Sequence, residues 1–231
     1  MNRKLIRVFG VQRSGLHAVA DWIKLSHAEQ FGYSIIFENA VSLERPNEIA
    51  KFLPLKGDLA EPFLWMTEHE DCVLIDLPNI HPKLSANYEI TDVVVVRDVF
   101  NTMASRRKMN GNMFNRRAIQ LWKQFAFEAK GSTSFLGPKK LVVNFNDWID
   151  SANRSEYAKE LQITGIGSQT DKQAAGSSWQ PNVPASELKL TERWKNYIDD
   201  SSFWNLFDAQ TYELNASIFG ENTDIKKLLG I

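Results

Sequence analysis

A strand, a glycine-bracketed loop and a helix follow one another near the start of the chain, in the stretch RKLIRVFGVQRSGLHAVADWI. The apolar run at 5–9 predicts a strand, the loop occupies 10–15, and an amphipathic helix is expected to end near Trp22 and Ile23. The unpaired N–H groups and the dipole of a helix start favour an anion, and glycines let the backbone approach it closely. This layout predicts a phosphate-binding loop in an α/β fold.

The residues after Gly15 distinguish this loop from the P-loop of ATP-using enzymes. The spacing of Gly10 and Gly15 fits that motif, but Leu16 and His17 stand where a Lys and a Ser or Thr hold the outer phosphates and Mg²⁺. The loop's only cation is Arg13. Metal-assisted ATP chemistry is therefore disfavoured, and a strand-to-helix turn without a ligand remains the alternative if the loop is judged alone.

A second junction of this kind lies in ITDVVVVRDVFNTMASRRK. The four valines predict a strand buried on both faces of a parallel sheet, with Arg97 and Asp98 at its carboxyl end. Ligands of open α/β sheets bind at that end, and Ser105, two turns into the next predicted helix, points back along the same face. Arg97 and Ser105 thus predict a clamp for a second phosphate. A solvated strand end with a local ion pair between Arg97 and Asp98 is the alternative.

Together the two segments resemble the sulfotransferases that use 3′-phosphoadenosine 5′-phosphosulfate (PAPS). In that family a Lys/Arg-Ser/Thr-Gly loop binds the 5′-phosphosulfate, and an Arg that closes a later strand binds the 3′-phosphate with a Ser further on. Arg13, Ser14 and Gly15 stand in the loop positions, and Ser105 follows Arg97 at the family's spacing of eight residues.

Further stretches extend the resemblance over most of the chain, as far as ERWKNYIDDSSFW. RDVFNTMASR is close to the RDP stretch of bacterial members, with Val99 replacing the proline, and AAGSSW is similar to a late Gly-Ser-Ser-Phe loop. The resemblance implies PAPS as co-substrate, with no metal, and a binding site formed by Gly10, Gln12, Arg13, Ser14, Gly15, Leu16, His17, Arg97, Ser105, Gly176, Ser177 and Ser178.

The chain departs from the family pattern in two places. Leu16 replaces a Thr whose hydroxyl contacts phosphate, so His17 either donates from its ring instead or caps the first helical turn. A late Arg-Lys-Gly loop is also missing, and the segment Gly176 to Ser178 is the expected substitute beside the 3′-phosphate.

The resemblance implies transfer of a sulfuryl group to a hydroxyl of a carbohydrate or small metabolite. Arg13 is expected to stabilise the charge that grows on the bridging oxygen. The base is open: Glu70 in TEHED and Asp76 in IDLP both follow apolar runs ahead of Arg97, and an ordinary surface or capping role is the alternative for each. If neither is the base, His17 or His69 becomes the next candidate.

The order of apolar runs predicts one domain over 1–231, a parallel sheet with helices on both faces. We expect strands in YSIIFENAV, in at least one of FLWMTEHED and CVLIDLPN, and in KLVVNFNDW, and a helix in NRRAIQLWKQFAFEAKG whose aromatic residues lie in the core. With 231 residues, 43% of them hydrophobic, the chain can bury such a core.

Charge and residue counts exclude several classes of protein. A net charge of −1 gives no basic footprint for nucleic acid, and the cluster Arg106, Arg107 and Lys108 is expected to be a solvated helix face rather than a patch for an acidic substrate. The four histidines show no metal-ligand spacing. One cysteine, with no signal-peptide or membrane-spanning pattern, predicts a cytoplasmic protein.

Two other functions fit the same loop. One is a nucleotide or small-molecule kinase of the P-loop type, and the other is a nucleotide-binding module without catalysis. The residues after Gly15 count against the kinase, whereas the loss of a hydroxyl at Leu16 keeps the inactive module open.

Overall fold

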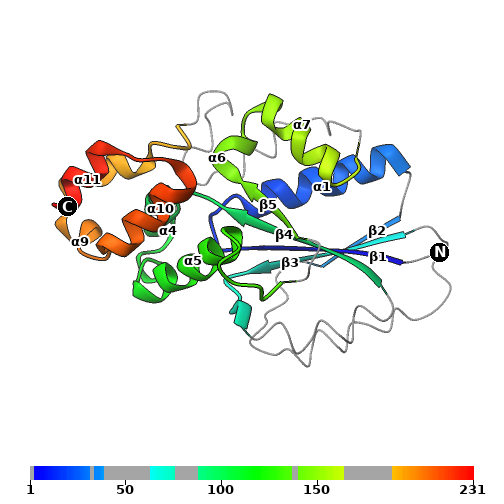
Figure 1. Cartoon of the computed structure of the whole chain (residues 1–231), viewed down its shortest axis with the longest axis horizontal. Coiled ribbons are helices and arrows are strands. Elements are labelled where there is room, and N and C mark those ends of the chain that lie inside the picture. Colours follow the sequence, from blue (N-terminus) through cyan, green and yellow to red (C-terminus); the bar gives the residue numbers. More distant parts are fainter. Residues whose placement is uncertain (1–2, 32–33, 39–62, 76–87, 137–139, 164–188) are drawn as a thin grey trace.

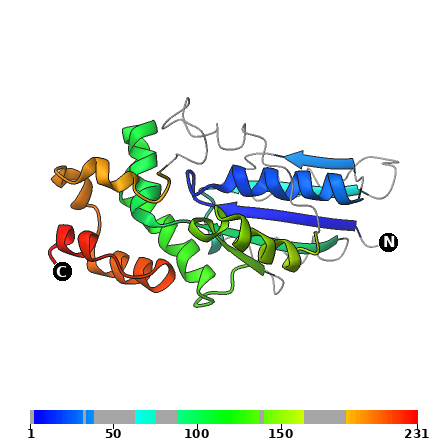
Figure 2. The ribbon, with the colours of Figure 1, turned by 90° about the horizontal axis from the view of Figure 1, so that it is seen from above.

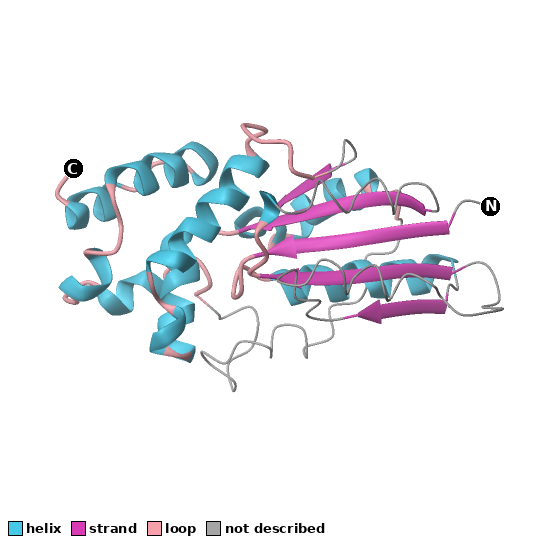
Figure 3. Cartoon of the chain, turned by 90° about the horizontal axis from the view of Figure 1, so that it is seen from below, coloured by secondary structure: helices cyan, strands magenta, loops and turns pink. Residues whose placement is uncertain are grey.

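A computed structural model describes residues 3–31, 34–38, 63–75, 88–136, 140–163 and 189–231 of the chain (Figure 1). Its centre is a parallel sheet of five strands in the order β2-β3-β1-β4-β5. Figure 3 shows that all strands point the same way, toward the end of the molecule where the C-terminal helices lie. The strands are β1 Arg3–Gly10, β2 Ser34–Glu38, β3 Phe63–Glu70, β4 Tyr88–Val96 and β5 Lys140–Asn144.

Helices cover both faces of the sheet and its carboxyl end (Figures 1 and 2). The described α-helices are α1 Leu16–Phe31, α4 Val99–Met109, α5 Arg116–Ala129, α6 Phe145–Trp148, α7 Ser151–Glu160, α9 Ser201–Trp204, α10 Ala209–Phe219 and α11 Thr223–Leu229. The described residues also form two short 3₁₀ helices, η2 Gly111–Met113 and η4 Arg193–Tyr197. The predicted α/β class is confirmed.

The valine strand separates two hydrophobic cores. Val94 and Val96 of β4 belong to the core beneath α4 and α5, whereas Val93 and Val95 belong to the core beneath α1 and α6. All four valines are buried because successive side chains of a strand point to opposite faces. The prediction of a strand buried on both faces is confirmed.

The position of β1 makes the connections after two neighbouring strands leave the sheet in different directions. β1 pairs with β3 on one side and β4 on the other, in parallel. The helix after β1 packs on one face of the sheet and the helix after β4 on the other, so the connections after these neighbouring strands diverge. Such a divergence at the carboxyl ends of parallel strands is where open α/β sheets bind their ligands.

One boundary differs from the sequence prediction. The first helix does not end near Ile23 but continues to Phe31, because Trp22 and Ile23 are core residues in its interior rather than its end. The prediction of a strand in at least one of FLWMTEHED and CVLIDLPN is confirmed, because the first run forms β3. In the second run, Leu74 and Ile75 form part of a 3₁₀ turn, and Leu74 is buried in the core beneath α4 and α5.

The C-terminal helices are joined to the sheet by aromatic packing. Phe203, Trp204 and Phe207 contact one another, and Phe100 of α4 packs against Trp204 and Phe207. This cluster holds η4 and α9 against α4, beside the end of β4. It therefore brings residues near 193 to the carboxyl edge of the sheet.

Candidate functional site

The loop after β1 has the backbone geometry of an anion cradle. Arg13 and Gly15 adopt positive φ angles of 74° and 97°, and the Ser14 N–H donates to the carbonyl of Val11 at 3.0 Å. A Cβ atom on Gly15 would lie 2.2 Å from the ring of Phe145, which explains the glycine there. The turn directs the chain from β1 into α1, whose first N–H groups face the loop.

An acidic residue at the end of β3 braces this loop. The Gln12 N–H donates to Asp71 Oδ1 at 2.9 Å, and Asp71 N–H donates to the Gly10 carbonyl at 3.1 Å. Arg106 binds both carboxylate oxygens of Asp71, at 2.8 and 3.0 Å, and also donates to the carbonyl of Gln12. The prediction of a solvated helix face was therefore wrong for Arg106, which is buried and fixes the loop.

Arg97 lies where the valine strand predicted it, at the carboxyl end of β4. Its guanidinium is buried and donates to the backbone carbonyls of Arg13 and Leu190. Asp98 is not needed as its ion partner, because that carboxylate caps α4 by accepting from the Asn101 N–H at 2.8 Å and also accepts from Asn215. The alternative of a solvated ion pair is thus wrong.

Ser105 joins the loop to this second position. Its hydroxyl accepts a hydrogen bond from Arg13 Nε at 3.2 Å and another from Arg193 Nη1 at 2.8 Å. Arg13, which we expected at the phosphosulfate, therefore reaches the place predicted for the second phosphate. Arg97, Ser105 and the loop meet at one edge of the sheet.

Arg193 is a residue of the site that sequence reasoning missed. It begins η4, is buried, and its N–H donates to Asn101 Oδ1 at 2.7 Å. In the sequence it is one of two basic residues within ERWK, and no motif marks it. Gly176, Ser177 and Ser178, predicted as the late contact, lie outside the described residues, and Arg193 occupies the side of the site for which they were suggested.

The three arginines concentrate positive charge at this edge of the sheet. Burial, followed by the charge of Arg193, lowers the pKa of Arg97 to about 9, and burial followed by the charge of Arg13 lowers the pKa of Arg193 to about 10. Like charges that depress one another's pKa are relieved by a bound anion. The arrangement is suited to phosphate, which guanidinium groups bind in a bidentate manner.

Two buried hydrogen-bond donors at the site, Arg97 Nε and the hydroxyl of Ser14, have no partner within the described part of the chain. The side-chain oxygen of Gln12 is a buried acceptor that also has none there. Buried polar groups are nearly always satisfied, so orphaned donors at a binding edge are consistent with a ligand that supplies acceptors. Leu16, by contrast, is buried in the core beneath α1, and only its backbone N–H can face an anion.

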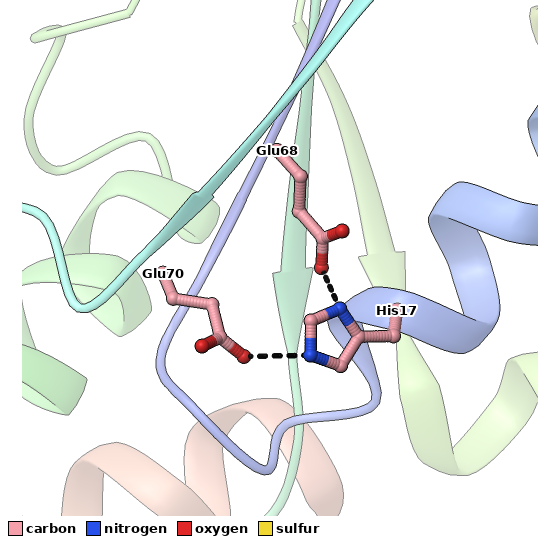
Figure 4. A group of neighbouring side chains, drawn as sticks. All are labelled: His17, Glu68 and Glu70. Carbon is pink, nitrogen blue, oxygen red and sulfur yellow. Dashed lines mark ion pairs between the residues drawn. The ribbon is translucent and has the colours of Figure 1, made fainter. Parts of the chain in front are cut away.

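His17 stands between two glutamates at the start of α1 (Figure 4). Its Nδ1 pairs with the buried carboxylate of Glu68, and its Nε2 lies 3.1 Å from Glu70 Oε1. The hydrogen bonds to Glu68 and then Glu70 raise the pKa of His17 to about 10. Gln12 donates to the other Glu70 oxygen at 3.3 Å, so this carboxylate adjoins the phosphate loop.

The remaining candidates for a base are placed elsewhere or lie outside the described residues. His69 alternates to the other face of β3, where it is buried, stacks on Phe9 at a ring distance of 4.7 Å and contacts the hydroxyl of Thr67. Asp76 lies outside the described residues. Of the predicted bases, the structure brings Glu70 and His17 together beside the loop.

Within the described segments, one group of three side chains has ligand atoms close enough to share a metal ion. It consists of His17, Glu68 and Glu70, whose ligand atoms lie within 4.8 Å of one another. The two carboxylates approach different nitrogens of the ring, as expected for a doubly protonated imidazole, which has two N–H donors and no lone pair for a metal.

None of the described helices has the length and apolar character needed to cross a membrane.

Comparison with known proteins finds similarity only at the level of structure. No family model matches the sequence, and no curated protein matches it either. Among solved structures, the chain is similar to the sulfotransferase domain from the Synechococcus PCC 7002 olefin synthase, with a TM-score of 0.59 and 10% sequence identity, over 96% of each chain. The chain therefore has the fold of that sulfotransferase domain.

Proposed function

We propose that this protein is a sulfotransferase that moves a sulfuryl group from PAPS to a hydroxyl of a carbohydrate or small metabolite. The observation that carries the proposal is the convergence of Arg13 and Arg193 on Ser105, with Arg97 bound to the Arg13 carbonyl of the glycine-bracketed loop. A loop cradle and a separate arginine clamp suit a nucleotide with anionic groups at two positions. The similar fold of a sulfotransferase domain supports this interpretation.

The two anionic ends of the donor would occupy two neighbouring parts of the site. The 5′-phosphosulfate would lie on the N–H groups of the loop and of the first turn of α1. The 3′-phosphate would lie against Arg97, Arg193 and the hydroxyl of Ser105. Arg13, which is hydrogen-bonded to Ser105, lies between the two parts and can serve either anion.

The proposed reaction transfers the sulfuryl group in a single displacement. The acceptor oxygen forms a bond to sulfur while the bond between sulfur and the bridging oxygen breaks, which leaves 3′-phosphoadenosine 5′-phosphate. The acceptor proton moves to Glu70, which lies beside the loop at the end of β3. The loop N–H groups and Arg13 stabilise the negative charge that grows on the leaving phosphate.

The side chains of the loop favour PAPS over ATP as the bound nucleotide. A kinase loop needs a lysine for the outer phosphates and a hydroxyl for Mg²⁺, but Leu16 is buried in the core and His17 is held by two glutamates. ATP has no phosphate on the 3′ position of its ribose, so it would leave the clamp at Arg97 and Arg193 without an anion to bind.

A thermal-shift comparison tests the proposed donor. A ligand that binds only the folded protein raises the melting temperature in step with its affinity. Adenosine 3′,5′-bisphosphate should raise it strongly, and ATP with Mg²⁺ should raise it little. Stabilisation by ATP and Mg²⁺ alone would instead support the kinase. Bisphosphate binding without sulfuryl transfer to any of a panel of sugar and phenol acceptors would support a binding module.

A further inference from the structure

Glu68 is a buried carboxylate that no motif in the sequence singles out. Its side chain is 1% exposed, and its Oε1 pairs with His17 Nδ1. A carboxylate removed from water is costly unless a partner compensates its charge. Alternation along β3 puts Glu68 and Glu70 on the same face, and Figure 4 shows both directed at the His17 ring. The pairing explains why a charged group is tolerated at this depth.

The two glutamates engage opposite nitrogens of one ring. Glu68 takes Nδ1, and Glu70 lies 3.1 Å from Nε2. Both nitrogens can donate only when the imidazole is doubly protonated. The charged groups that act on His17 are these two carboxylates, while Arg13 of the loop acts on Glu70. The geometry therefore suits an imidazolium held between two carboxylates.

A proton competes well with a metal ion at this cluster. The pKa of His17 is raised to about 10 by its hydrogen bonds to Glu68 and Glu70. A metal that displaced this proton at pH 7 would lose about 10³-fold in apparent affinity, because each unit between pH and pKa costs a factor of ten.

We propose that Glu68 is a positioning residue for sulfuryl transfer: it fixes the His17 ring through Nδ1, keeps His17 cationic, and directs the Nε2–H at Glu70. This inference rests on the proposed function. His17 lies in the first turn of α1 beside the loop, so its charge would lie next to the anionic donor and next to the base. His17 keeps both of its protons throughout the reaction, and the acceptor proton goes to Glu70.

The test is the variant Glu68→Gln, which keeps the shape of the side chain and removes its charge. We expect the pKa of His17, followed by NMR of its ring nitrogens, to fall by at least one unit. Sulfuryl transfer should then decline about tenfold per pH unit above the lowered His17 pKa, at a pH where the wild type, whose His17 pKa is raised, shows no decline from this group. Affinity for adenosine 3′,5′-bisphosphate should change less than about threefold.

Glu89→Gln is the matched control, because it makes the same change of charge at the amino end of β4, far from the loop. It should leave both the His17 pKa and the pH profile unchanged. If Glu68→Gln also leaves both unchanged, the inference is overturned. A wild-type His17 pKa near 6.5 overturns it even if the variant does not fold.

Two further outcomes separate this inference from others. A stoichiometric heat on titration of the wild type with Zn²⁺ or Mn²⁺ at pH 7, absent in Glu68→Gln, overturns it in favour of a metal site. A lowered His17 pKa in a protein that neither binds the bisphosphate nor transfers sulfuryl overturns the proposed function, and with it the catalytic purpose of Glu68. The NMR titration distinguishes that case, because it does not depend on activity.

Discussion

Arg193 Nη1 donates a hydrogen bond to Ser105 Oγ at 2.8 Å across 88 residues of sequence. This contact joins the first turn of η4 to α4, at the carboxyl end of the valine strand. Both side chains are buried, so the hydrogen bond is shielded from water. It completes the proposed clamp for a 3′-phosphate, and it makes the C-terminal part of the chain a contributor to the site.

Arg193→Ala should weaken the binding of adenosine 3′,5′-bisphosphate by roughly 10- to 100-fold, because a charge-assisted contact to phosphate is lost. Isothermal calorimetry measures the change. Lys195→Ala is the control: Lys195 lies in the same short helix but is exposed and pairs with Glu192 on the surface. Equal losses in the two variants would mean that Arg193 acts through general charge and not through the clamp.

Gly15→Ala should destabilise the fold by about 2 to 4 kcal/mol, since the new Cβ meets a ring and the backbone is strained for an L-residue. The glycine has a φ of 97°, and the Cβ would lie 2.2 Å from Phe145. Urea unfolding gives the free energy. The double variant Gly15→Ala with Phe145→Leu should recover part of the loss relative to Phe145→Leu alone. Gly131→Ala, where a Cβ meets nothing within 4 Å at a φ of 71°, provides the comparison for backbone strain alone.

Glu70→Gln should lower turnover by about 10²- to 10⁴-fold with little effect on nucleotide affinity, because a general base acts in the transition state and not on donor binding. Turnover is followed with labelled donor and a responsive acceptor. Asp76→Asn, the other carboxylate predicted from the sequence, should be nearly silent. If the effects are reversed, Asp76 is the base and the pairing of Glu70 with His17 has another purpose.

The buried side chain of His27 should make the folded protein less stable in mild acid. Burial, followed by the charge of Lys4, lowers its pKa to about 4 from 6.5, and it lines a cavity of about 310 Å³ at the amino end of the sheet. Below pH 6.5 the His27 imidazole is protonated in the unfolded chain but stays neutral in the folded chain until the pH reaches about 4. The free energy of unfolding therefore falls as pH drops from 6.5 toward about 4. The loss should reach at most about 3 kcal/mol.

Urea unfolding between pH 7 and pH 4 measures this dependence. The variant His27→Leu should have a shallower decline over that interval, because the titrating group is gone. An unchanged decline in the variant would show that other groups cause the acid sensitivity.

Local patterns predicted the sheet and much of the site. The apolar runs with their flanking glycine, and the four valines before Arg97, identify strands whose carboxyl ends meet, and that is enough to bring Arg97 and Ser105 to the loop. The sequence pattern is local because β1 and β4 are each buried on both faces and each is followed, after a short connection, by a helix.

The contributions that were not predicted come from tertiary contacts. Arg193 reaches the site because Phe203, Trp204 and Phe207 pack η4 and α9 against α4, and no local pattern encodes that docking. Arg106 belongs to a basic run that is typical of a solvent-exposed helix face, but its side chain is buried because it binds the carboxylate of Asp71.

Glu68 was missed for a related reason. It is buried between the buried residues Thr67 and His69 in β3, and its partner His17 lies on a different element. A buried charge is recognised only when the group that compensates it is known.

The most direct test of the account is calorimetry with adenosine 3′,5′-bisphosphate and adenosine 5′-phosphate, on the wild type and on Arg97→Ala. Arg97 lies buried at the end of β4 and donates to the Arg13 carbonyl at 3.2 Å. The account predicts that the wild type prefers the bisphosphate and that Arg97→Ala remains folded by circular dichroism. The variant should lose roughly 30- to 1,000-fold in affinity for the bisphosphate, or about 2 to 4 kcal/mol, and with it the preference. Equal binding of the bisphosphate by the wild type and Arg97→Ala, or equal binding of both nucleotides by the wild type, would contradict it.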